Sequence, residues 1–350
     1  MSTNKLKKLS ICTRYGRLGA SSRVRYFLYE DTFRQYGWEP HYHGLLPDAY
    51  LKRLYRRQTV FWLGLFGLLR RLLTAVFYGD RLLIEYELLP FLPWALEKLY
   101  LRCRRYVLNF DDDVWEKYRG RRLLENKFDQ LIRHAAGVIA ANDLLYEKIA
   151  PLNCNTIKIP SVIDLDAYRA RSEKFARFTV VWIGTAITFR ECLKPMAAGL
   201  AQAAERTDFQ LLIIADTDLE ELPGVPCRFV KWDGRNEATL LSQAHVGIMP
   251  LPDLQFMRGK SAYKLIQYLG AGIPAIASPV GENRRLAEQA DGAIILADTP
   301  EQWAEEIFRL ASDEKLRRRL ELRAQAVAYN WSLQKYAPIM GDFLRKCVRD

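Results

Sequence analysis

The chain has 350 residues, 49% of them hydrophobic and 27% charged, so it is long enough for two domains of ordinary size and is not a disordered chain. Six scattered cysteines without a Cys-x-x-Cys or Cys/His cluster support neither a disulfide framework nor a zinc site. The net charge of +11 is uneven, with 28 Lys/Arg against 18 Asp/Glu in residues 1–170 and 24 against 23 in the remainder, which indicates that the N-terminal half meets an anionic partner.

The first half of the chain alternates strand and helix patterns. Strands are predicted at residues 8–13, 38–43, 81–86, 105–110 and 137–141. A helix is predicted at residues 23–36, ending at Gly37, and the alternation predicts a parallel, doubly wound α/β sheet. Residues 1–10 are polar and lysine-rich, unlike a cleavable signal peptide, so we expect a cytoplasmic protein.

A loop with two glycines follows the first predicted strand and opens the first helix. Its sequence, Gly16-Arg-Leu-Gly-Ala-Ser-Ser-Arg23, lacks the G-x-G-x-x-G spacing of a dinucleotide fold, which weakens a dehydrogenase interpretation. Gly16 and Gly19 let a ligand approach the backbone, and Arg23 or Arg25 suits an anionic acceptor. We therefore predict that this loop lies on the acceptor side of a site.

The segment at about residues 50–78 is basic and amphipathic. No acidic residue lies between Asp48 and Asp80, while the basic residues are Lys52, Arg53, Arg56, Arg57, Arg70 and Arg71. Taken as one helix, it has a narrow face of polar or small residues formed by Arg53, Arg57, Gly64, Gly67, Arg71 and Thr74, and apolar residues fill the remainder. Its apolar run at residues 59–69 is too short to span a bilayer, but it suits the interface of an anionic membrane. The alternative is a helix buried between the sheet and its neighbours, with arginines reaching water. Nucleic acid is not an expected partner, since no nucleic-acid motif is present.

Three aspartates, Asp111, Asp112 and Asp113, follow the predicted strand at residues 105–110. Carboxylates at the carboxyl end of a parallel strand face the ligand crevice. We predict that one of them orients an acceptor hydroxyl or accepts its proton. The alternatives are a divalent cation site and a cap on the next helix. His134 is assigned to packing.

After a charged stretch at about residues 166–178, which predicts an interdomain linker, the α/β pattern restarts. Strands are predicted at residues 179–183, 209–214, 227–230, 246–249 and 275–278, and helices at residues 193–204 and 261–269. We predict one domain at residues 1–165 and a second at residues 178–331. The last segment, residues 331–348, is amphipathic.

On the predicted helix at residues 261–269, polar and apolar residues separate to opposite sides. Lys260, Lys264 and Gln267 follow i, i+4, i+7 spacing and share one face. Two cations and an amide beside a helix N-terminus, next to glycine loops, suit a phosphorylated ligand that carries a hydroxylated sugar. The alternative is an ordinary core helix with solvated lysines.

The stretch from Gly259 to Gly281 resembles the donor-site signature of the family 4 glycosyltransferases, retaining enzymes of the GT-B architecture with two Rossmann-like domains facing a central cleft. It is most similar to the subgroup pattern G-K-x-x-x-K-x-x-Q-Y-x-A-x-G-x-P-x-x-A-S-x-V-G, with Gly270 at the position of its first alanine. Many members of the wider family carry two glutamates at the positions of Gly259 and Gln267. The resemblance also implies that a C-terminal helix at about residues 332–350 packs back on the first domain.

The resemblance implies roles for individual residues. Lys260 and Lys264 would bind the diphosphate of a nucleotide sugar, and Gln267 would meet the ribose. The other expected donor-site residues are Gly184, Thr185, Arg190, Lys194, Arg258 and Gly281. The subgroup's D-x-D-D-x-x-W pattern similarly matches Asp111, Asp112 and Asp113.

These observations predict a retaining glycosyltransferase that moves a sugar from a nucleotide diphosphate sugar to a membrane-proximal glycan or lipid-linked acceptor in cell-envelope polysaccharide biosynthesis. Lysines, arginines and helix amides can stabilise the departing diphosphate, so we expect no metal or other cofactor. We expect a cytoplasmic, peripherally membrane-associated protein. Two alternatives stay open: a nucleotide-sugar epimerase of the GT-B fold and a non-catalytic GT-B partner protein. The donor nucleotide, uridine or guanosine diphosphate, also stays open.

Overall fold

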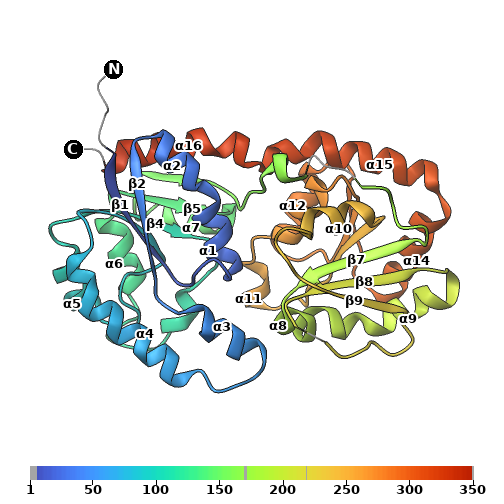
Figure 1. Ribbon diagram of the computed structural model, residues 1–350, viewed down its shortest axis with the longest axis horizontal. Helices are drawn as coiled ribbons and strands as arrows, with labels where there is room; N and C mark the ends of the chain where they lie inside the picture. The colour runs from blue at the N-terminus through green and yellow to red at the C-terminus, as the bar shows by residue number, and fades with distance from the viewer. Residues whose placement is uncertain (1–5, 169–171, 218, 349–350) are drawn as a thin grey trace. The chain divides into compact units, whose positions relative to one another are not determined.

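The computed structural model describes residues 6–168, 172–217 and 219–348. The chain divides into two compact units, one formed by Met1–Val162 with Lys335–Asp350 and the other by Ile163–Gln334. In each unit helices lie on both sides of a parallel sheet (Figure 1). Parts of three predicted segments, residues 1–5, 169–171 and 349–350, lie outside the described residues. In the described parts of the chain, no helix is both long and apolar enough to cross a membrane.

The first unit contains a six-stranded parallel sheet in the order β2-β1-β3-β4-β5-β6. Its strands are β1 (Lys7–Thr13), β2 (Trp38–Gly44), β3 (Arg81–Glu85), β4 (Arg105–Phe110), β5 (Gly137–Ala140) and β6 (Thr156–Lys158). Its helices are α1 (Ala20–Arg25), α2 (Glu30–Gln35), α3 (Asp48–Tyr55), α4 (Phe61–Thr74), α5 (Trp94–Leu101), α6 (Lys127–His134) and α7 (Asp143–Ile149). The strand order reverses between β1 and β3, the position at which open parallel sheets bind ligands at their carboxyl edge.

Two helix predictions in this unit are wrong. The predicted helix at residues 23–36 is two helices, α1 and α2, because the chain leaves helical geometry at Tyr26, where φ is −132°. This break allows the sequence neighbours Arg25 and Tyr26 both to be buried. The predicted single helix after Asp48 is also two helices, α3 and α4, because Arg57 adopts a left-handed φ of 57° just beyond α3.

The second unit contains a six-stranded parallel sheet in the order β12-β11-β10-β7-β8-β9. Its strands are β7 (Thr179–Gly184), β8 (Gln210–Ala215), β9 (Cys227–Lys231), β10 (Val246–Met249), β11 (Ala275–Ala277) and β12 (Ile294–Leu296). Its helices are α8 (Ala186–Thr188), α9 (Ala197–Arg206), α10 (Glu237–Gln243), α11 (Gln255–Arg258), α12 (Tyr263–Gly270), α13 (Glu282–Gln289), α14 (Pro300–Ser312) and α15 (Glu314–Val327). The order reverses between β7 and β10, as in a dinucleotide-binding Rossmann sheet.

The helix predicted at residues 193–204 is longer and less regular than expected. It begins at Ala186 with α8, passes through a π-helical turn at Phe189–Leu193 and a 3-10 turn at Lys194–Met196, and continues as α9. A π-helical turn inside a helix often occurs at a functional site. Strands β6 and β12 were not predicted: each has three residues, lies at the edge of its sheet and is only partly buried, whereas the equally short β11 lies inside the sheet and is fully buried.

The C-terminal helix α16 (Leu333–Val348) begins in the second unit, and its residues from Lys335 onwards belong to the first. Within the first unit, Asn155 Nδ2 lies 3.1 Å from the Cys347 sulfur and Arg345 donates a hydrogen bond to the Tyr36 carbonyl. Gly137 makes this packing close, because a Cβ atom at this position would lie 2.5 Å from the Cys347 sulfur.

Candidate functional site

Helix α12 is anchored on the sheet of the second unit by Tyr268. A Cβ atom at Gly247 of β10 would lie 2.3 Å from the Tyr268 ring, so only glycine permits this approach. The Tyr268 hydroxyl donates a hydrogen bond to the Ile248 carbonyl at 3.0 Å and accepts one from the Ile183 amide at 3.4 Å. These contacts tie α12 to the carboxyl ends of both β10 and β7.

Lys264 lies one turn before Tyr268, and its Nζ atom is 5.6 Å from the centre of the Trp182 ring of β7. Burial, together with the charge of Lys260, lowers the pKa of Lys264 to about 8. Among the described residues, neither Lys260 nor Lys264 forms an ion pair with a carboxylate. The structure therefore brings two positive charges together without a negative partner, an arrangement that favours binding of an anion.

The backbone before α12 is held in an unusual conformation. Ala262, between the two lysines, has a left-handed φ of 51°, which is costly for a residue with a side chain and is typical of functional sites. Gly281, at the start of α13, has a φ of 52°, and a Cβ atom there would lie 2.3 Å from the Arg258 carbonyl oxygen. The loops that follow β10 and β11 therefore pack directly on each other, with Gly281 at their contact.

The turn after β7 contains Gly184 and Thr185. A Cβ atom at Gly184 would lie 2.5 Å from the Trp182 ring, the ring that Lys264 also faces. Thr185 caps the helical segment, since the Thr188 amide donates to Thr185 Oγ1 at 3.4 Å and the Thr185 amide donates to Thr188 Oγ1 at 3.1 Å. Lys264 and this glycine turn thus both lie next to Trp182. Lys260 does not share the helix face predicted for it, because α12 begins at Tyr263, and the Lys260 Nζ atom lies 4.8 Å from the centre of the Phe256 ring.

The other cations predicted for the donor site have carboxylate neighbours. Arg258 donates two hydrogen bonds to Asp253, at 2.7 and 3.0 Å, and this pairing raises the pKa of Arg258. Lys194 pairs with Glu220 at 2.8 Å. Burial raises the pKa of Asp216, and the positive charge of Arg190 partly opposes this shift. Lys260 and Lys264 are therefore better placed than these three residues to receive an external anion.

The sequence analysis missed a carboxylate, Glu237 of α10, next to Gln267. Gln267 is 4% exposed, and its Nε2 atom donates to Glu237 Oε1 at 2.7 Å. The Tyr168 hydroxyl donates to the same oxygen at 3.0 Å, and Trp232 Nε1 donates to Glu237 Oε2 at 2.6 Å. The sequence feature that could have indicated Glu237 is its position shortly after the predicted strand at residues 227–230.

In the first unit the three predicted aspartates have different surroundings. Asp111 is 6% exposed and accepts a hydrogen bond from the Tyr86 hydroxyl. Asp113 accepts a hydrogen bond from the Trp115 amide at 3.2 Å and pairs with Lys148 at 3.0 Å, as the capping alternative requires. Asp112 is partly buried. Within the described ranges, no group of three or more His, Cys, Asp or Glu side chains could hold a metal ion.

A second carboxylate that the sequence analysis missed is Glu85 at the end of β3. Glu85 is 4% exposed and accepts hydrogen bonds from the Arg14 amide at 2.7 Å, Ser21 Oγ at 3.0 Å and Ser22 Oγ at 2.8 Å. Burial and the neighbouring charge of Asp111 raise the pKa of Glu85. The sequence feature that could have indicated Glu85 is the one that indicated Asp111: an acidic residue at the end of an apolar strand.

These bonds attach the predicted acceptor-side loop to the sheet. A Cβ atom at Gly16 would lie 2.7 Å from Asp48 Oδ1, and one at Gly19 would lie 2.4 Å from Tyr15 Cβ, so both glycines permit close packing. Arg23 is partly buried. Arg25 does not meet a ligand as expected, because it is 2% exposed and donates to Asn109 Oδ1 and the Ile159 carbonyl.

Helix α4 packs its polar side inward. Arg71 is 2% exposed and donates to the carbonyls of Leu88 and Thr13, at 3.3 and 2.8 Å. A Cβ atom at Gly67 would lie 2.5 Å from the Leu45 carbonyl oxygen. The face that the sequence analysis assigned to polar or small residues is therefore the face that contacts the rest of the first unit.

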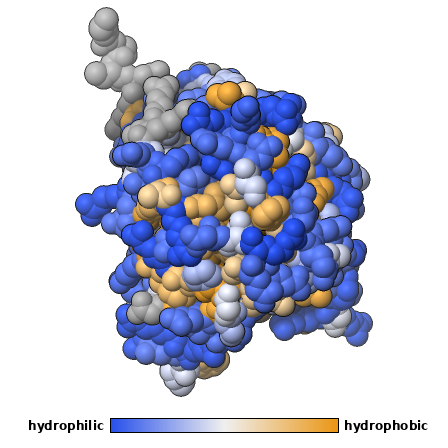
Figure 2. All heavy atoms as spheres, turned by 90° about the vertical axis from the view of Figure 1, so that its right-hand side faces the viewer, coloured by the Kyte–Doolittle hydropathy of each residue, from blue (hydrophilic) through white to orange (hydrophobic). Residues whose placement is uncertain are grey.

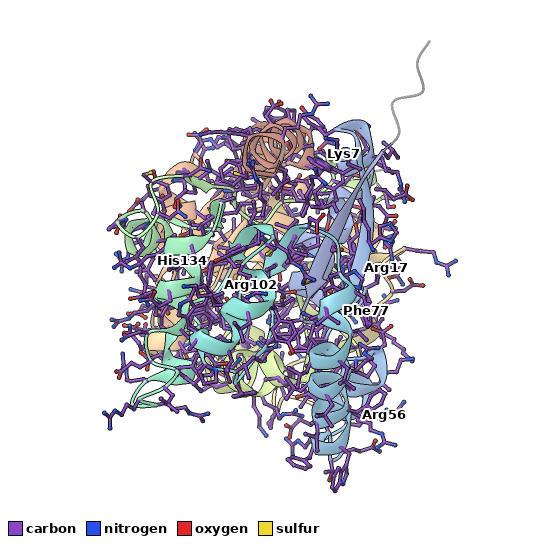
Figure 3. All side chains as sticks on the ribbon, turned by 90° about the vertical axis from the view of Figure 1, so that its left-hand side faces the viewer. Lys7, Arg17, Arg56, Phe77, Arg102 and His134 are labelled. Atoms are coloured by element: carbon purple, nitrogen blue, oxygen red, sulfur yellow. The ribbon has the colours of Figure 1, made fainter. Side chains whose placement is uncertain are left out.

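The opposite face of α4 is exposed, so the alternative of a buried helix is wrong. We call it the outer face; it is formed by Phe61, Trp62, Phe66, Leu69 and Leu73, with Val76 and Phe77 of the next turn, and these residues are 50–80% exposed. Figure 3 labels Phe77 at one end of this segment and Arg56 at the other. The face of the protein in Figure 2 shows, for contrast, a mostly hydrophilic surface with smaller apolar groups. Apolar surface gathered along one helix is typical of an interaction site.

Two parallel six-stranded sheets, each covered by helices, define the GT-B fold, so the predicted α/β GT-B class is confirmed. Residues 177–313 match a family profile described as "Glycosyl transferases group 1". The second unit thus carries a group 1 glycosyltransferase domain, which together with the fold supports a glycosyl-transferring enzyme.

Solved structures of the same fold cover nearly the whole chain. Sucrose-phosphate synthase from Thermosynechococcus elongatus aligns with a TM-score of 0.67 and 14% identity, over 97% of this chain and 98% of that chain. Anabaena HepE in complex with UDP and glucose aligns with a TM-score of 0.68 and 14% identity, over 97% and 99%. S. aureus TarM aligns with a TM-score of 0.55 and 11% identity, over 79% of this chain and 58% of that chain. Among curated proteins, no sequence matches.

Proposed function

We propose that this protein transfers a glycosyl group from a UDP-sugar to a membrane-proximal glycan or lipid-linked acceptor. The group 1 domain supports glycosyl transfer, and the similarity to HepE, solved with UDP-glucose, favours uridine over guanosine in the donor. Retention of configuration and membership of family 4 belong to the same proposal and rest on the resemblance of residues 259–281 to that donor-site signature.

The observation that carries the proposal is the pair of neighbouring lysines Lys260, just before α12, and Lys264, on α12. Lys264 faces Trp182 beside the Gly184 turn, where the strand order reverses, and the charge of Lys260 acts on it. No carboxylate forms an ion pair with either lysine among the described residues. When the bond between sugar and diphosphate breaks, negative charge builds on the diphosphate, and preorganised cations stabilise it. In this proposal the reaction requires no metal ion or other cofactor.

On the ribose side, Gln267 and Glu237 act together. The Gln267 amide nitrogen donates to Glu237, so the carboxylate of Glu237 restores next to Gln267 the negative charge that many family 4 members carry at that position. A carboxylate accepts hydrogen bonds from ribose hydroxyls more strongly than a neutral amide does. We assign ribose recognition to this pair.

On the acceptor side, Asp111 and Glu85 are the carboxylates at the carboxyl ends of β4 and β3. Asp112 remains a candidate to orient or deprotonate the acceptor hydroxyl, while Asp113 is engaged as a cap and with Lys148. Burial raises the pKa of Glu85, so this carboxylate is a stronger proton acceptor than an ordinary glutamate.

Membrane association rests on the outer face of α4 and on the exposed basic residues in and just after α3. Lys52, Arg53, Arg56 and Arg57 are exposed beside that face. Aromatic residues flanked by cations bind the interface of an anionic leaflet. We therefore propose a peripheral membrane enzyme on the cytoplasmic side that acts in cell-envelope polysaccharide biosynthesis.

A panel of UDP- and GDP-sugars, incubated with the full-length protein with and without a lipid-linked acceptor, tests this function. We expect acceptor-dependent release of UDP and a glycoside with the anomeric configuration of the donor. An epimerised donor sugar without glycoside would indicate the epimerase alternative, and nucleotide binding without turnover would indicate a non-catalytic partner.

A further inference from the structure

A pocket of about 180 Å³ lies within the first unit at the carboxyl edge of its sheet. One wall is α4, which contributes Gly64 and Leu68. The facing wall follows β3 and includes Glu85 and Phe91. The pocket thus lies beside the reversal of strand order between β1 and β3, where open parallel sheets bind ligands.

The lining of this pocket is apolar over most of its extent. The apolar residues are Leu45, Leu46, Leu68, Pro90, Phe91, Val114 and Phe128. Two of the charged lining residues neutralise each other, since Lys117 Nζ lies 2.6 Å from Glu87 Oε1. The pocket therefore suits a hydrocarbon group more than a free sugar.

A cation lies at the pocket. Arg14 lines it and is exposed, and its guanidinium carbon is 5.4 Å from the centre of the Tyr15 ring. The Arg14 backbone amide, not the side chain, bonds to Glu85. The Glu85 carboxylate attracts the Arg14 guanidinium and contributes to its raised pKa without accepting a hydrogen bond from it, so the donors of the guanidinium can pair with an anion such as a phosphate group.

Two glycines of α4 differ in what surrounds them. A Cβ atom at Gly67 would lie 2.5 Å from the Leu45 carbonyl oxygen, so this glycine is required for packing. A Cβ atom at Gly64, one turn earlier, would meet only Tyr50 Cε2 at 3.6 Å, an ordinary contact. Packing of α4 therefore does not require glycine at position 64. Because Gly64 lines the pocket, its lack of a side chain leaves open space in the pocket.

The outer face of α4 lies on the other side of the same helix. If the outer face of this protein lies in a membrane, the pocket is separated from the membrane by one helix width, about 10 Å. We propose that the pocket binds the hydrocarbon chain of a lipid-linked acceptor, with the lipid phosphate paired to Arg14. This inference rests on the proposed function for the identity of the lipid as acceptor.

Binding of decyl phosphate, below its micelle concentration, to the full-length protein by calorimetry tests this proposal. We expect Gly64→Leu, which fills the open space, to weaken binding at least about tenfold, and the matched control Gly64→Ala to stay within about threefold. Arg14→Gln should weaken binding of decyl phosphate but not of decanol, which lacks the phosphate charge. Leu68→Phe narrows the pocket from the same helix and serves as a second filling variant if Gly64→Leu does not fold.

Other outcomes would overturn the proposal. Wild-type protein that does not bind decyl phosphate, or a filled variant that folds and binds like wild type, would contradict it. Weakening by Phe66→Ser on the outer face, without weakening by Gly64→Leu, would place the ligand outside the pocket. Tighter binding of lysophosphatidylglycerol than of decyl phosphate would indicate a site for bulk phospholipid rather than for an acceptor.

The same assays separate this inference from the proposed function. If Lys264→Ala binds UDP as tightly as wild type, the donor assignment fails while the pocket result stands. If Lys264→Ala weakens UDP binding but Gly64→Leu leaves the affinity for decyl phosphate unchanged, only the pocket inference fails.

Discussion

Helix α12 of the second unit buries Leu265 and leaves Lys264 partly accessible, as an amphipathic helix in water does. Helix α4 of the first unit has the opposite arrangement, with Arg71 buried and Trp62 and Phe66 exposed to 73% and 61%. The cost of exposing aromatic residues is offset only if another apolar phase covers them. The comparison teaches that α12 directs its apolar side into the protein core, whereas α4 directs its polar and small residues into the protein and its apolar side outward. Our proposals follow from this difference: a charged ligand at α12 and an apolar surface at α4.

The largest expected effect is a loss of folding stability when a buried side chain of α12 is shortened. Leu265 is fully buried, and Leu265→Ala should lower the free energy of unfolding by about 3 kcal/mol, because it removes apolar contacts and leaves a cavity. The matched change on α4 is Leu73→Ala, at a residue that is 70% exposed, and it should change stability by less than about 0.5 kcal/mol. Urea denaturation measures both, and equal losses would show that the two helices do not differ in burial.

The second test removes the apolar surface of α4. Changing Phe61, Trp62 and Phe66 together to Ser should weaken binding to anionic vesicles about 150-fold, because each side chain contributes roughly 1 kcal/mol on entering the interface. Folding stability should not fall, since these residues are exposed. Vesicle sedimentation measures the binding, and unchanged sedimentation would contradict a membrane role for the outer face.

The third test concerns charge beside that face. Arg53→Gln together with Arg56→Gln should weaken vesicle binding about 30-fold at low salt, because each basic residue near an anionic surface contributes about 1 kcal/mol. Arg71 is unsuitable for this test because it is buried and holds main-chain carbonyls. This loss of vesicle affinity should be smaller at high salt, and a loss that is the same at low and high salt would argue against an electrostatic contribution.

The smallest expected effect is a pH dependence at Lys264. Because the pKa of Lys264 is lowered to about 8, its positive charge is lost as the pH rises through that value, and UDP affinity should fall several-fold between about pH 7 and pH 9. Folding stability should move the other way, since above this pKa the unfolded chain binds more protons than the folded chain does. Lys264→Arg should remove the pH dependence of affinity in calorimetric titrations, and a variant that keeps it would reassign the titrating group.

Much of the fold followed from the sequence, because apolar strands of four or more residues alternate with helices in both halves. Where the chain departs from regular geometry, the sequence carried no signal: Arg57 adopts a left-handed conformation that its residue type does not favour. The three-residue strands β6 and β12 lie at the edges of their sheets and are only partly buried, so they lack the fully buried apolar pattern that revealed the equally short β11.

The candidate site was predictable where it depends on local spacing. Lys264 and Gln267 lie on α12 as their spacing predicted, and Lys264 faces the Trp182 ring beside Gly184. Lys260 was wrongly predicted to share that helix, because α12 begins only at Tyr263, after the left-handed Ala262. The bond between Gln267 and Glu237 joins residues 30 positions apart, so no local pattern could reveal it. For the same reason, the inward side of α4 was not predictable, because Arg71 is buried by hydrogen bonds to distant carbonyls.

The central proposal is that Lys264 of α12, together with Lys260 just before this helix, binds the diphosphate of a nucleotide sugar. Titration of UDP into wild type and Lys264→Ala at neutral pH tests it most directly, with Lys315→Ala, at an exposed lysine of α15, as the control. We expect at least about 30-fold weaker binding in Lys264→Ala, since a charged hydrogen bond contributes roughly 2 kcal/mol, and no change in the control. Equal affinity of Lys264→Ala and wild type for UDP would contradict the account.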